Sequence, residues 1–273
     1  MEIKKAIIPA AGYGTRCLPI TKVVPKEMFP INGKAALHYI VEEAVAAGIE
    51  EIFIILSRNR TLIMDYFDRS IELETFLKKM NKQHLLEKLA LPDVTIQFIR
   101  QPHANGLGDA IRLGERFVNG EPFAVLLPDD LFISPKHTSV LAELVNVYKQ
   151  YNKSIIGLQE VESELLKRYG VIAGHPLSSD EYKIENVVEK PQTNPPSNLA
   201  IVGRYIFEPA IFQKLKNIGI GKGGEVQLTD AIKALLISHT VIGKIIEGCR
   251  YDIGIEEDYQ RLIQEFSEKK SST

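Results

Sequence analysis

The chain has 273 residues, and its 33 lysines and arginines nearly balance its 35 aspartates and glutamates. A net charge of −2 argues against bulk electrostatic binding to nucleic acid or to anionic lipid. No apolar run is long enough to cross a bilayer, and two cysteines, Cys17 and Cys249, form neither a disulfide framework nor a metal cluster. We therefore expect a cytoplasmic protein without nucleic-acid or membrane partners, folded as a single domain over residues 1–273.

Strand-like and helix-like patterns alternate along the first half of the sequence. Short apolar runs predict strands at 6–9, 52–56, 94–99 and 123–127. Apolar residues at helical spacing predict amphipathic helices at 37–45, 107–117 and 140–148. The repeated β-α-β order predicts a Rossmann-like α/β fold, in which a mixed, mostly parallel sheet carries helices on both faces.

Residues from about 61 to 91 interrupt this alternation with helical patterns, which predict a helical insertion. Its apolar side chains pack either on a partner subunit or within the same chain, and the sequence leaves both open. Extended patterns return later, at 154–158, 170–173, 183–189, 200–207 and 240–246. Two further helices are expected, at 228–236 and from about 256 onward.

A glycine turn directly follows the first predicted strand, in the segment 10–16, which reads AAGYGTR. Glycines allow a sharp turn and a close approach to a ligand, and successive backbone N–H groups there can cradle an anion. Arg16 adds a fixed fork of donors suited to phosphate oxygens. Because Cys17 stands where the dinucleotide fingerprint needs a third glycine, a purely structural turn remains the alternative.

Two more cations follow Arg16 within eleven positions. Lys22 and Lys26 lie in the segment TKVVPKEM, which lacks the hydrophobic period of a surface helix. The three charges predict either a clamp on a polyphosphate, stiffened by the neighbouring prolines, or a solvated basic loop.

Acidic residues occur where two predicted strands end. Asp129 and Asp130 follow the strand at 123–127, and ligands of open α/β sheets bind outside that edge. Magnesium typically takes one or two carboxylates together with phosphate oxygens and water. Asp252 comes after the late strand region, where it is either a second metal ligand or a helix cap. For Asp129 and Asp130, the alternative is an Asp-rich turn that binds no metal.

Polar residues also mark the ends of two other predicted strands. Glu189 and Lys190 end an extended run, and they suit either a sugar phosphate or a weak surface ion pair. Gln101 follows the third strand, and Gly106 and Gly108 open the next helix. This arrangement suits hydrogen bonds to the edge of a nucleobase, or else a flexible helix entry.

Taken in order, these motifs resemble the bacterial UTP–glucose-1-phosphate uridylyltransferases, within the sugar-nucleotidyltransferase superfamily. The resemblance rests on AAGYGTRCLPITKVVPKEMFPI, RQ…GLGDAI, LLPDD, RYGVI, VVEKP, PSNLAIVGRYIF and GGEVQLTDAI. These segments span nearly the whole chain. The resemblance implies transfer of UMP from UTP to glucose 1-phosphate, giving UDP-glucose and pyrophosphate with Mg²⁺ as cofactor. It also implies a homodimer or a homotetramer.

The resemblance further implies roles for individual residues. The nucleotide site would comprise Ala10, Ala11, Gly12, Gly14, Thr15, Glu27, Gln101, Gly106 and Asp130. The catalytic cations would be Arg16 and Lys26, holding the triphosphate, together with Lys190. The sugar phosphate would be bound by Gly170, Glu189 and Lys190. The metal would be held by Asp129 and Asp252.

One position departs from the family pattern, because Asp109 stands where the family usually has a histidine after Gly-Leu-Gly. An aspartate in the first turn of a helix is favourable for folding. It would nevertheless add negative charge if its side chain faced the phosphates, which bears on turnover and on nucleotide preference.

Three alternatives stay open on the sequence. A sister nucleotidyltransferase would use dTTP or another sugar 1-phosphate, since uracil and thymine differ by one methyl group. A metal-dependent glycosyltransferase would use Asp129 and Asp130, but it would not account for Arg16 and Lys26 together. A binding module without catalysis would not need all of these charged residues.

Overall fold

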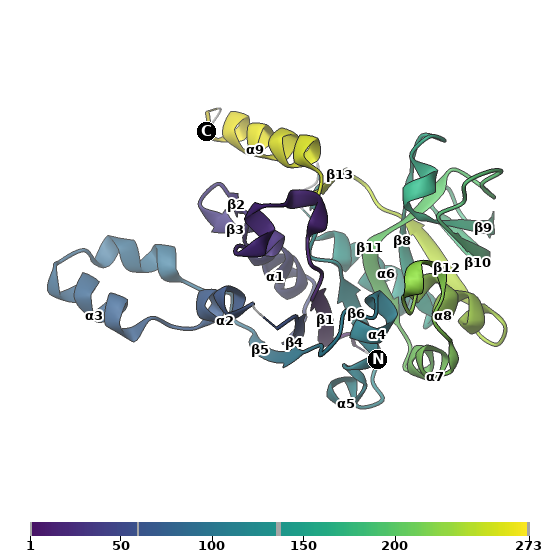
Figure 1. Cartoon of the computed structure of the whole chain (residues 1–273), viewed down its shortest axis with the longest axis horizontal. Helices are drawn as coiled ribbons and strands as arrows, with labels where there is room; N and C mark the ends of the chain where they lie inside the picture. Colours follow the sequence, from purple (N-terminus) through teal and green to yellow (C-terminus); the bar gives the residue numbers. More distant parts are fainter. Residues whose placement is uncertain (1, 59, 135–137, 272–273) are drawn as a thin grey trace.

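A nine-stranded mixed sheet forms the centre of the protein (Figure 1). The computed structural model describes residues 2–58, 60–134 and 138–271. The strand order is β5-β4-β1-β6-β11-β8-β12-β10-β9. The order confirms the α/β fold, and it places the first half of the chain on one side of the sheet and most of the second half on the other.

The first side of the sheet is the parallel one. It consists of β1 (Lys5–Ala10), β4 (Glu51–Leu56), β5 (Thr95–Arg100) and β6 (Phe123–Leu126), paired in parallel. All four strands were predicted, and their carboxyl ends share one edge. Binding residues that follow these strands are therefore brought together.

The second side is largely antiparallel. Its strands are β8 (Ser154–Glu160), β9 (Gly170–Pro176), β10 (Glu181–Glu189), β11 (Leu199–Phe207) and β12 (Val241–Ile245). Only β8 and β12 pair in parallel there. The expected parallel character thus holds for the first half of the chain, whereas β9, β10 and β11 run antiparallel to their neighbours in the second.

Helices cover both faces of the sheet, as predicted. One face carries α1 (Ala36–Ala46) and α6 (Val140–Tyr151), and the other carries α4 (Leu107–Arg112), α5 (Glu115–Val118), α7 (Ala210–Asn217) and α8 (Leu228–Leu236). Alternation along β1 explains the two layers, since Ile8 enters the first core and Ile7 the second. No helix in the described ranges is long and apolar enough to span a membrane.

Some elements differ from the prediction. The expected helix at 107–117 is split into α4 and α5 around Gly114, where a Cβ atom would collide with Ile7 of β1. The sequence analysis also missed α7 and two small two-stranded sheets. These are β2 (Pro30–Ile31) with β3 (Lys34–Ala35), and β7 (Asp130–Ile133) with β13 (Cys249–Asp252).

The helical insertion forms an arm that projects from the body of the molecule (Figure 1). It comprises α2 (Thr61–Phe67), α3 (Ile71–Lys79) and a 3-10 segment, η4 (Gln83–Leu89). Ile63 and Phe67 anchor α2 in the core, whereas Ile71 and Phe76 of α3 are exposed. At the other end of the chain, α9 (Glu256–Ser271) follows β13.

Candidate active site

A hollow of about 290 Å³ lies at the carboxyl ends of β1, β5 and β6, the edge expected to bind ligand. It brings together seven of the predicted site residues, namely Ala11, Gly12, Lys26, Glu27, Gln101, Gly106 and Asp129. Leu107, Ala110 and Leu127 add an apolar wall. A partly apolar hollow with a few polar groups at one end suits a flat base attached to a charged chain.

The polar groups at one end of this hollow come from Gln101 and the turn before α4. The Gln101 side chain is 5% exposed, and its Nε2 donates to Asp109 at 2.9 Å and to the Gly106 carbonyl at 3.4 Å. Arg112 donates to the other Asp109 oxygen at 2.6 Å. Asp109 is therefore neutralised by Arg112 and faces Gln101.

Gly106 is required by its surroundings as well as by its backbone conformation. Its φ of +103° is unfavourable for any residue with a side chain, and a Cβ atom would lie 2.7 Å from the Cβ of Glu225. The segment around Val226 is tied to this turn, because its N–H donates to Asn105 and its carbonyl accepts from Gly108. The second half of the chain thus closes one wall of the hollow.

Lys26 and Asp129 form the central ion pair of the site, with Nζ 2.5 Å from Oδ2. Lys26 belongs to the 3-10 turn η3 (Lys26–Met28), and Asp129 follows β6. Burial by itself lowers the pKa of Lys26, but the charges of Asp129 and Glu27 outweigh it and the pKa is raised. Burial pushes the pKa of Asp129 upward, yet Lys26 holds it below its ordinary value.

Glu27 is a buried carboxyl group on the wall of the same hollow, with only 1% of its surface exposed. Its Oε2 has no hydrogen-bond partner among the described residues. Burial raises the pKa of Glu27, although the charge of Lys26 opposes the rise. A buried polar atom without a partner is costly for the fold, so it is a candidate to contact a ligand.

Arg16 and Asp252 form a second ion pair beside the first. Arg16 Nη1 lies 3.0 Å from Asp252 Oδ2, and the guanidinium is 54% exposed. The two acidic segments are adjacent, because the N–H of Ile253 donates to the Asp129 carbonyl at 2.9 Å. Gly254 leaves room for this pair, since a Cβ there would meet both Arg16 and Asp252 at less than 3.0 Å. We call the Lys26–Asp129 and Arg16–Asp252 pairs the substrate-side pairs.

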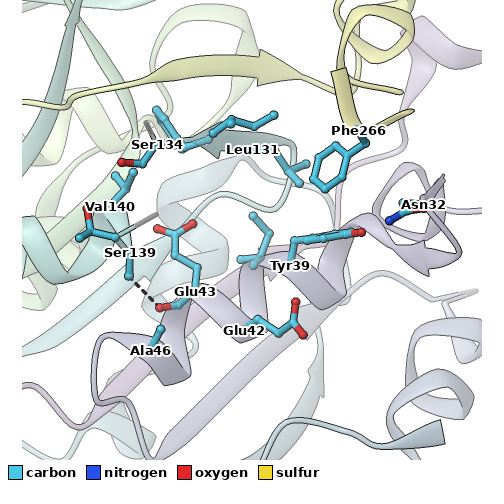
Figure 2. Close-up of a pocket in the computed structure, with 14 residues that line it drawn as sticks. Asn32, Tyr39, Glu42, Glu43, Ala46, Leu131, Ser134, Ser139, Val140 and Phe266 are labelled. Atoms are coloured by element: carbon cyan, nitrogen blue, oxygen red, sulfur yellow. Dashed lines mark hydrogen bonds between the residues drawn. The ribbon is translucent and has the colours of Figure 1, made fainter. Parts of the chain in front are cut away.

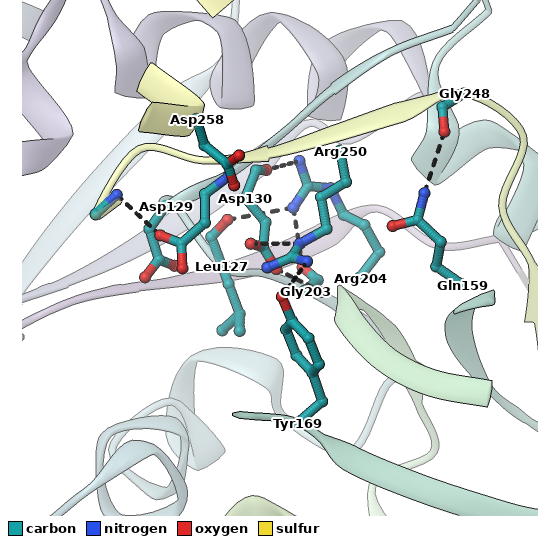
Figure 3. Close-up of polar contacts among 12 residues, drawn as sticks. Leu127, Asp129, Asp130, Gln159, Tyr169, Gly203, Arg204, Gly248, Arg250 and Asp258 are labelled. Atoms are coloured by element: carbon teal, nitrogen blue, oxygen red, sulfur yellow. Dashed lines mark hydrogen bonds and ion pairs between the residues drawn. The ribbon is translucent and has the colours of Figure 1, made fainter. Parts of the chain in front are cut away.

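Asp130 lies behind Asp129 with its carboxylate already engaged (Figure 3). Its Oδ2 accepts from the N–H of Gly203 at 3.0 Å, and its Oδ1 accepts from Arg250 Nε at 2.8 Å. The Arg250 guanidinium also donates to the Tyr169 hydroxyl and stacks 4.8 Å from that ring. Asp130 therefore fixes the loop that follows β6. A ligand could contact this carboxylate directly only by replacing one of these two hydrogen bonds.

Arg204 is the most enclosed cation near the site, with no exposed surface. Its guanidinium donates to the carbonyls of Leu127, Gly203 and Asp130 (Figure 3). It also makes two hydrogen bonds to Glu43. The carbonyls of Leu127 and Asp130 flank Asp129 along the chain, and that of Gly203 belongs to the neighbouring strand β11. We call Arg204–Glu43 and Arg250–Asp130 the rear pairs, because they hold the backbone that presents the substrate-side pairs.

Glu43 also borders a second hollow of about 600 Å³, between α1, α6 and α9 (Figure 2). Ser139 donates to the Glu43 carbonyl at 2.9 Å, and the N–H of Leu141 donates to its carboxylate at 3.1 Å. Glu43 therefore ties the N-terminus of α6 to Arg204. None of the predicted site residues lines this hollow.

A third group of predicted residues gathers where β9 begins and β10 ends. Glu189 pairs with Gly170 in the sheet register and lies 3.1 Å from Lys190 Nζ. The Thr229 hydroxyl donates to Glu189 at 2.9 Å. A Cβ at Gly170 would collide with Thr229 at 2.7 Å, so glycine keeps this wall open. Tyr169 joins the group to Asp130 through Arg250.

Three predicted nucleotide-site residues lie elsewhere. Ala10 is buried in the core, so only its backbone can reach a ligand. Gly14 has φ +65° and packs against Thr21, and Thr15 lines a neighbouring hollow of about 380 Å³ together with Gln101. The sequence analysis named no role for Arg204, Arg250 or Thr229, although Thr229 lies inside one of the motifs used.

Comparison with known proteins assigns the family. The family model described as nucleotidyl transferase matches residues 5–269. The chain belongs to the nucleotidyl transferase family. A Bacillus subtilis (strain 168) protein provisionally named UTP–glucose-1-phosphate uridylyltransferase is 54% identical to this nucleotidyl transferase over 261 residues, 96% of each chain.

Two similar solved structures contain a bound nucleotide, UDP-glucose in one and UTP in the other. A UDP-glucose pyrophosphorylase complexed with UDP-glucose has a TM-score of 0.88 at 43% identity and covers 98% of this chain and 99% of its own. A UTP-bound UGPase from Acinetobacter baumannii has a TM-score of 0.88 at 36% identity, with coverage of 97% and 93%. The fold of this nucleotidyl transferase is therefore that of UDP-glucose pyrophosphorylases.

Proposed function

We propose that this nucleotidyl transferase moves UMP from UTP to glucose 1-phosphate, forming UDP-glucose and pyrophosphate. The observation that carries the proposal is the hollow at the strand ends, with a base-sized apolar wall at one side and the Lys26–Asp129 pair at the other. The relatives described above support the choice of substrates. Because both substrates are cellular metabolites, we place the reaction in the cytoplasm, carried out by a single domain.

The proposed nucleotide site extends along this hollow. Ala11, Gly12, Glu27, Gln101 and Gly106 would surround the uridine, with support from the backbone of Ala10, Gly14 and Thr15 and from Asp130 behind Asp129. Arg16 and Lys26 would hold the triphosphate. Gly170, Glu189 and Lys190 would bind the glucose phosphate, with Thr229 orienting Glu189.

Asp129 and Asp252 fit a magnesium site in their chemistry. Both are carboxylates at adjoining backbone segments, and both are neutralised here by cations that substrate phosphates could displace. No cluster of three acidic, histidine or cysteine side chains exists in the described ranges. This agrees with Mg²⁺, which needs only one or two carboxylates when phosphates and water complete its shell. When bound, Mg²⁺ would neutralise phosphate charge as a Lewis acid.

The chemistry follows from charge. A phosphate monoester has a second pKa of about 6, so the sugar phosphate is largely ionised at neutral pH and needs no general base to attack the α-phosphorus of UTP. The difficulty is repulsion between two anions. Lys190 would hold the attacking phosphate, while Lys26 and Arg16 would stabilise the negative charge that develops on the departing pyrophosphate. The rigid sheet edge would hold the two in line.

Pyrophosphate release, measured for every pairing of UTP, dTTP and CTP with glucose 1-phosphate and N-acetylglucosamine 1-phosphate, tests the proposal. We expect the highest rate for UTP with glucose 1-phosphate, and loss of that rate when Mg²⁺ is chelated. A higher rate with dTTP or with N-acetylglucosamine 1-phosphate would instead identify a related nucleotidyltransferase with a different substrate. UDP-glucose and pyrophosphate should also give UTP, which a glycosyltransferase would not form.

We further propose that the protein is a homodimer or a homotetramer assembled through the arm. Ile71, Phe76 and Met80, on α3 and just beyond it, are large apolar residues that are exposed to solvent. Light scattering after chromatography should show dissociation of the variant Phe76→Glu/Met80→Glu. Ile237→Glu, which alters an even more exposed apolar residue after α8, should leave the assembly intact. A monomeric wild-type protein would overturn this assignment.

A further inference from the structure

The orientation of the Gln101 carboxamide is fixed by its partners. Its nitrogen faces the Asp109 carboxylate and the Gly106 carbonyl, at 2.9 and 3.4 Å. Both partners can only accept a hydrogen bond, so the amide nitrogen, and not the oxygen, must point toward them. Rotation of the amide by 180° would place two acceptors against each other.

The amide oxygen is consequently left on the wall of the hollow. Gln101 lines this hollow beside Ala11, Gly12 and Gly106, and within the described part of the chain no group donates to its Oε1. The oxygen is an acceptor only. A ligand therefore gains a hydrogen bond there only if it offers a donor.

Pyrimidine bases differ in what they offer to such an acceptor. Uracil and thymine carry a hydrogen on N3, whereas N3 of cytosine is a bare acceptor. A buried site that hydrogen-bonds an N–H group strongly rejects an analogue without it, because a polar atom is then left unpaired. Opposite N3, the fixed oxygen of Gln101 thus matches uracil and thymine and opposes cytosine, whose donor on this edge is the neighbouring N4 amino group instead.

We propose that Asp109 is a positioning residue that sets base specificity by holding the Gln101 carboxamide in its acceptor orientation. Arg112 holds Asp109 in turn, through the 2.6 Å bond to its second oxygen. The Asp109 carboxylate therefore influences recognition of the base, and it does not place additional negative charge beside the phosphates. This inference rests on the proposed uridine site, and it concerns which nucleoside triphosphate that site accepts.

Asp109→Asn tests this role with almost no change of shape. An asparagine can either accept from the Gln101 nitrogen or donate to its oxygen, so both amide orientations become available. We expect the ratio of kcat/KM for UTP over CTP to fall about tenfold or more, mainly through a lower KM for CTP. The ratio for UTP over dTTP should stay unchanged, because both bases carry the N3 hydrogen.

Arg112→Met is the matched control. It removes the other partner of Asp109 but leaves the contact between Asp109 and Gln101, so its UTP-over-CTP ratio should stay near that of the wild type. A general structural role for Asp109 would instead move both variants together, and that result would overturn the proposal. An unchanged ratio in Asp109→Asn, with melting temperature preserved, would overturn it as well.

Calorimetric binding of UTP and CTP to the wild-type protein and to Asp109→Asn supplies a readout that does not depend on turnover. Convergence of the two affinities in the variant supports the proposal, and an unchanged difference refutes it. Failure of the proposed function looks different, since the wild-type protein would then release no pyrophosphate from UTP and glucose 1-phosphate.

Discussion

The substrate-side pairs and the rear pairs use the same kinds of residues for opposite purposes. Arg16, in a substrate-side pair, is 54% exposed, whereas Arg204, in a rear pair, has no exposed surface. Arg16 bonds a single carboxylate, while Arg204 bonds Glu43 and three backbone carbonyls. The first guanidinium can exchange its partner for a phosphate, and the second cannot do so without disrupting the loop.

The difference shows how one sheet edge can be rigid and still bind highly charged ligands. A buried charge without a partner is expensive, so an unliganded phosphate site needs temporary counter-ions. In the proposed phosphate site, Asp129 and Asp252 would fill that role for Lys26 and Arg16. The rear pairs contribute no charge to the ligand, but they keep the temporary pairs in place.

Arg204→Met should break the rear pair and give the largest effect on stability. The change leaves the largely enclosed carboxylate of Glu43, 13% exposed, without its cation, and removing one member of a buried pair costs about 3–5 kcal/mol. Urea denaturation of the variant measures this cost. The double variant Arg204→Met/Glu43→Met removes both charges and should recover part of it. A loss below about 1 kcal/mol in the single variant would mean that the rear pair does not hold the loop.

Lys26→Met should break the substrate-side pair and act mainly on catalysis. Removing one donor that stabilises developing charge typically lowers kcat about 10²- to 10³-fold. Pyrophosphate release measures the change, and circular dichroism should show a folded protein. Lys22→Met is the matched control, because Lys22 is an exposed lysine in the same segment and lines a different hollow. Equal losses in both variants would contradict a specific role for Lys26.

Much of the hollow at the strand ends was predictable from local sequence. The glycine turn after β1, the acidic residues after β6 and Gln101 after β5 all follow parallel strands, whose carboxyl ends must share an edge. Periodicity alone was enough to locate the four strands of that half and to predict that they run parallel. The family resemblance then supplied roles that the pattern by itself left open, such as that of Asp252.

The rear pairs were not predictable in the same way. Arg204 lies in the apolar run of β11 and reads as an interruption, and its partner Glu43 is 161 positions away. Arg250 meets Asp130 where β7 and β13 pair as antiparallel strands, across 120 positions. Neither β7 nor β13 has the length or the periodicity that marks a strand in the sequence. Only the tertiary fold brings these charged residues together.

The pH dependence of stability offers a finer test of the substrate-side pair. Lys26 holds the folded pKa of Asp129 below its unfolded value of about 3.9, against the effect of burial. The stabilisation is therefore present above that value and is lost as the pH falls through the folded pKa. The unfolding free energies of wild type and Asp129→Asn, measured by urea titration, should differ at neutral pH and converge in acid. A constant difference would mean that the ionised pair does not contribute.

The smallest effect is expected for an ion pair that belongs to neither class. Lys216 lies 2.6 Å from Glu115, and both side chains are at least 40% exposed. Such pairs contribute about 0–1 kcal/mol, because water screens the charges and ordering two long side chains costs entropy. Lys216→Met should therefore leave both the urea midpoint and pyrophosphate release close to wild type. If this variant lost as much stability as Arg204→Met, burial of the charges could not be what separates the rear pairs from ordinary surface ion pairs. The contrast between the substrate-side pairs and the rear pairs would then have to rest on their position in the chain.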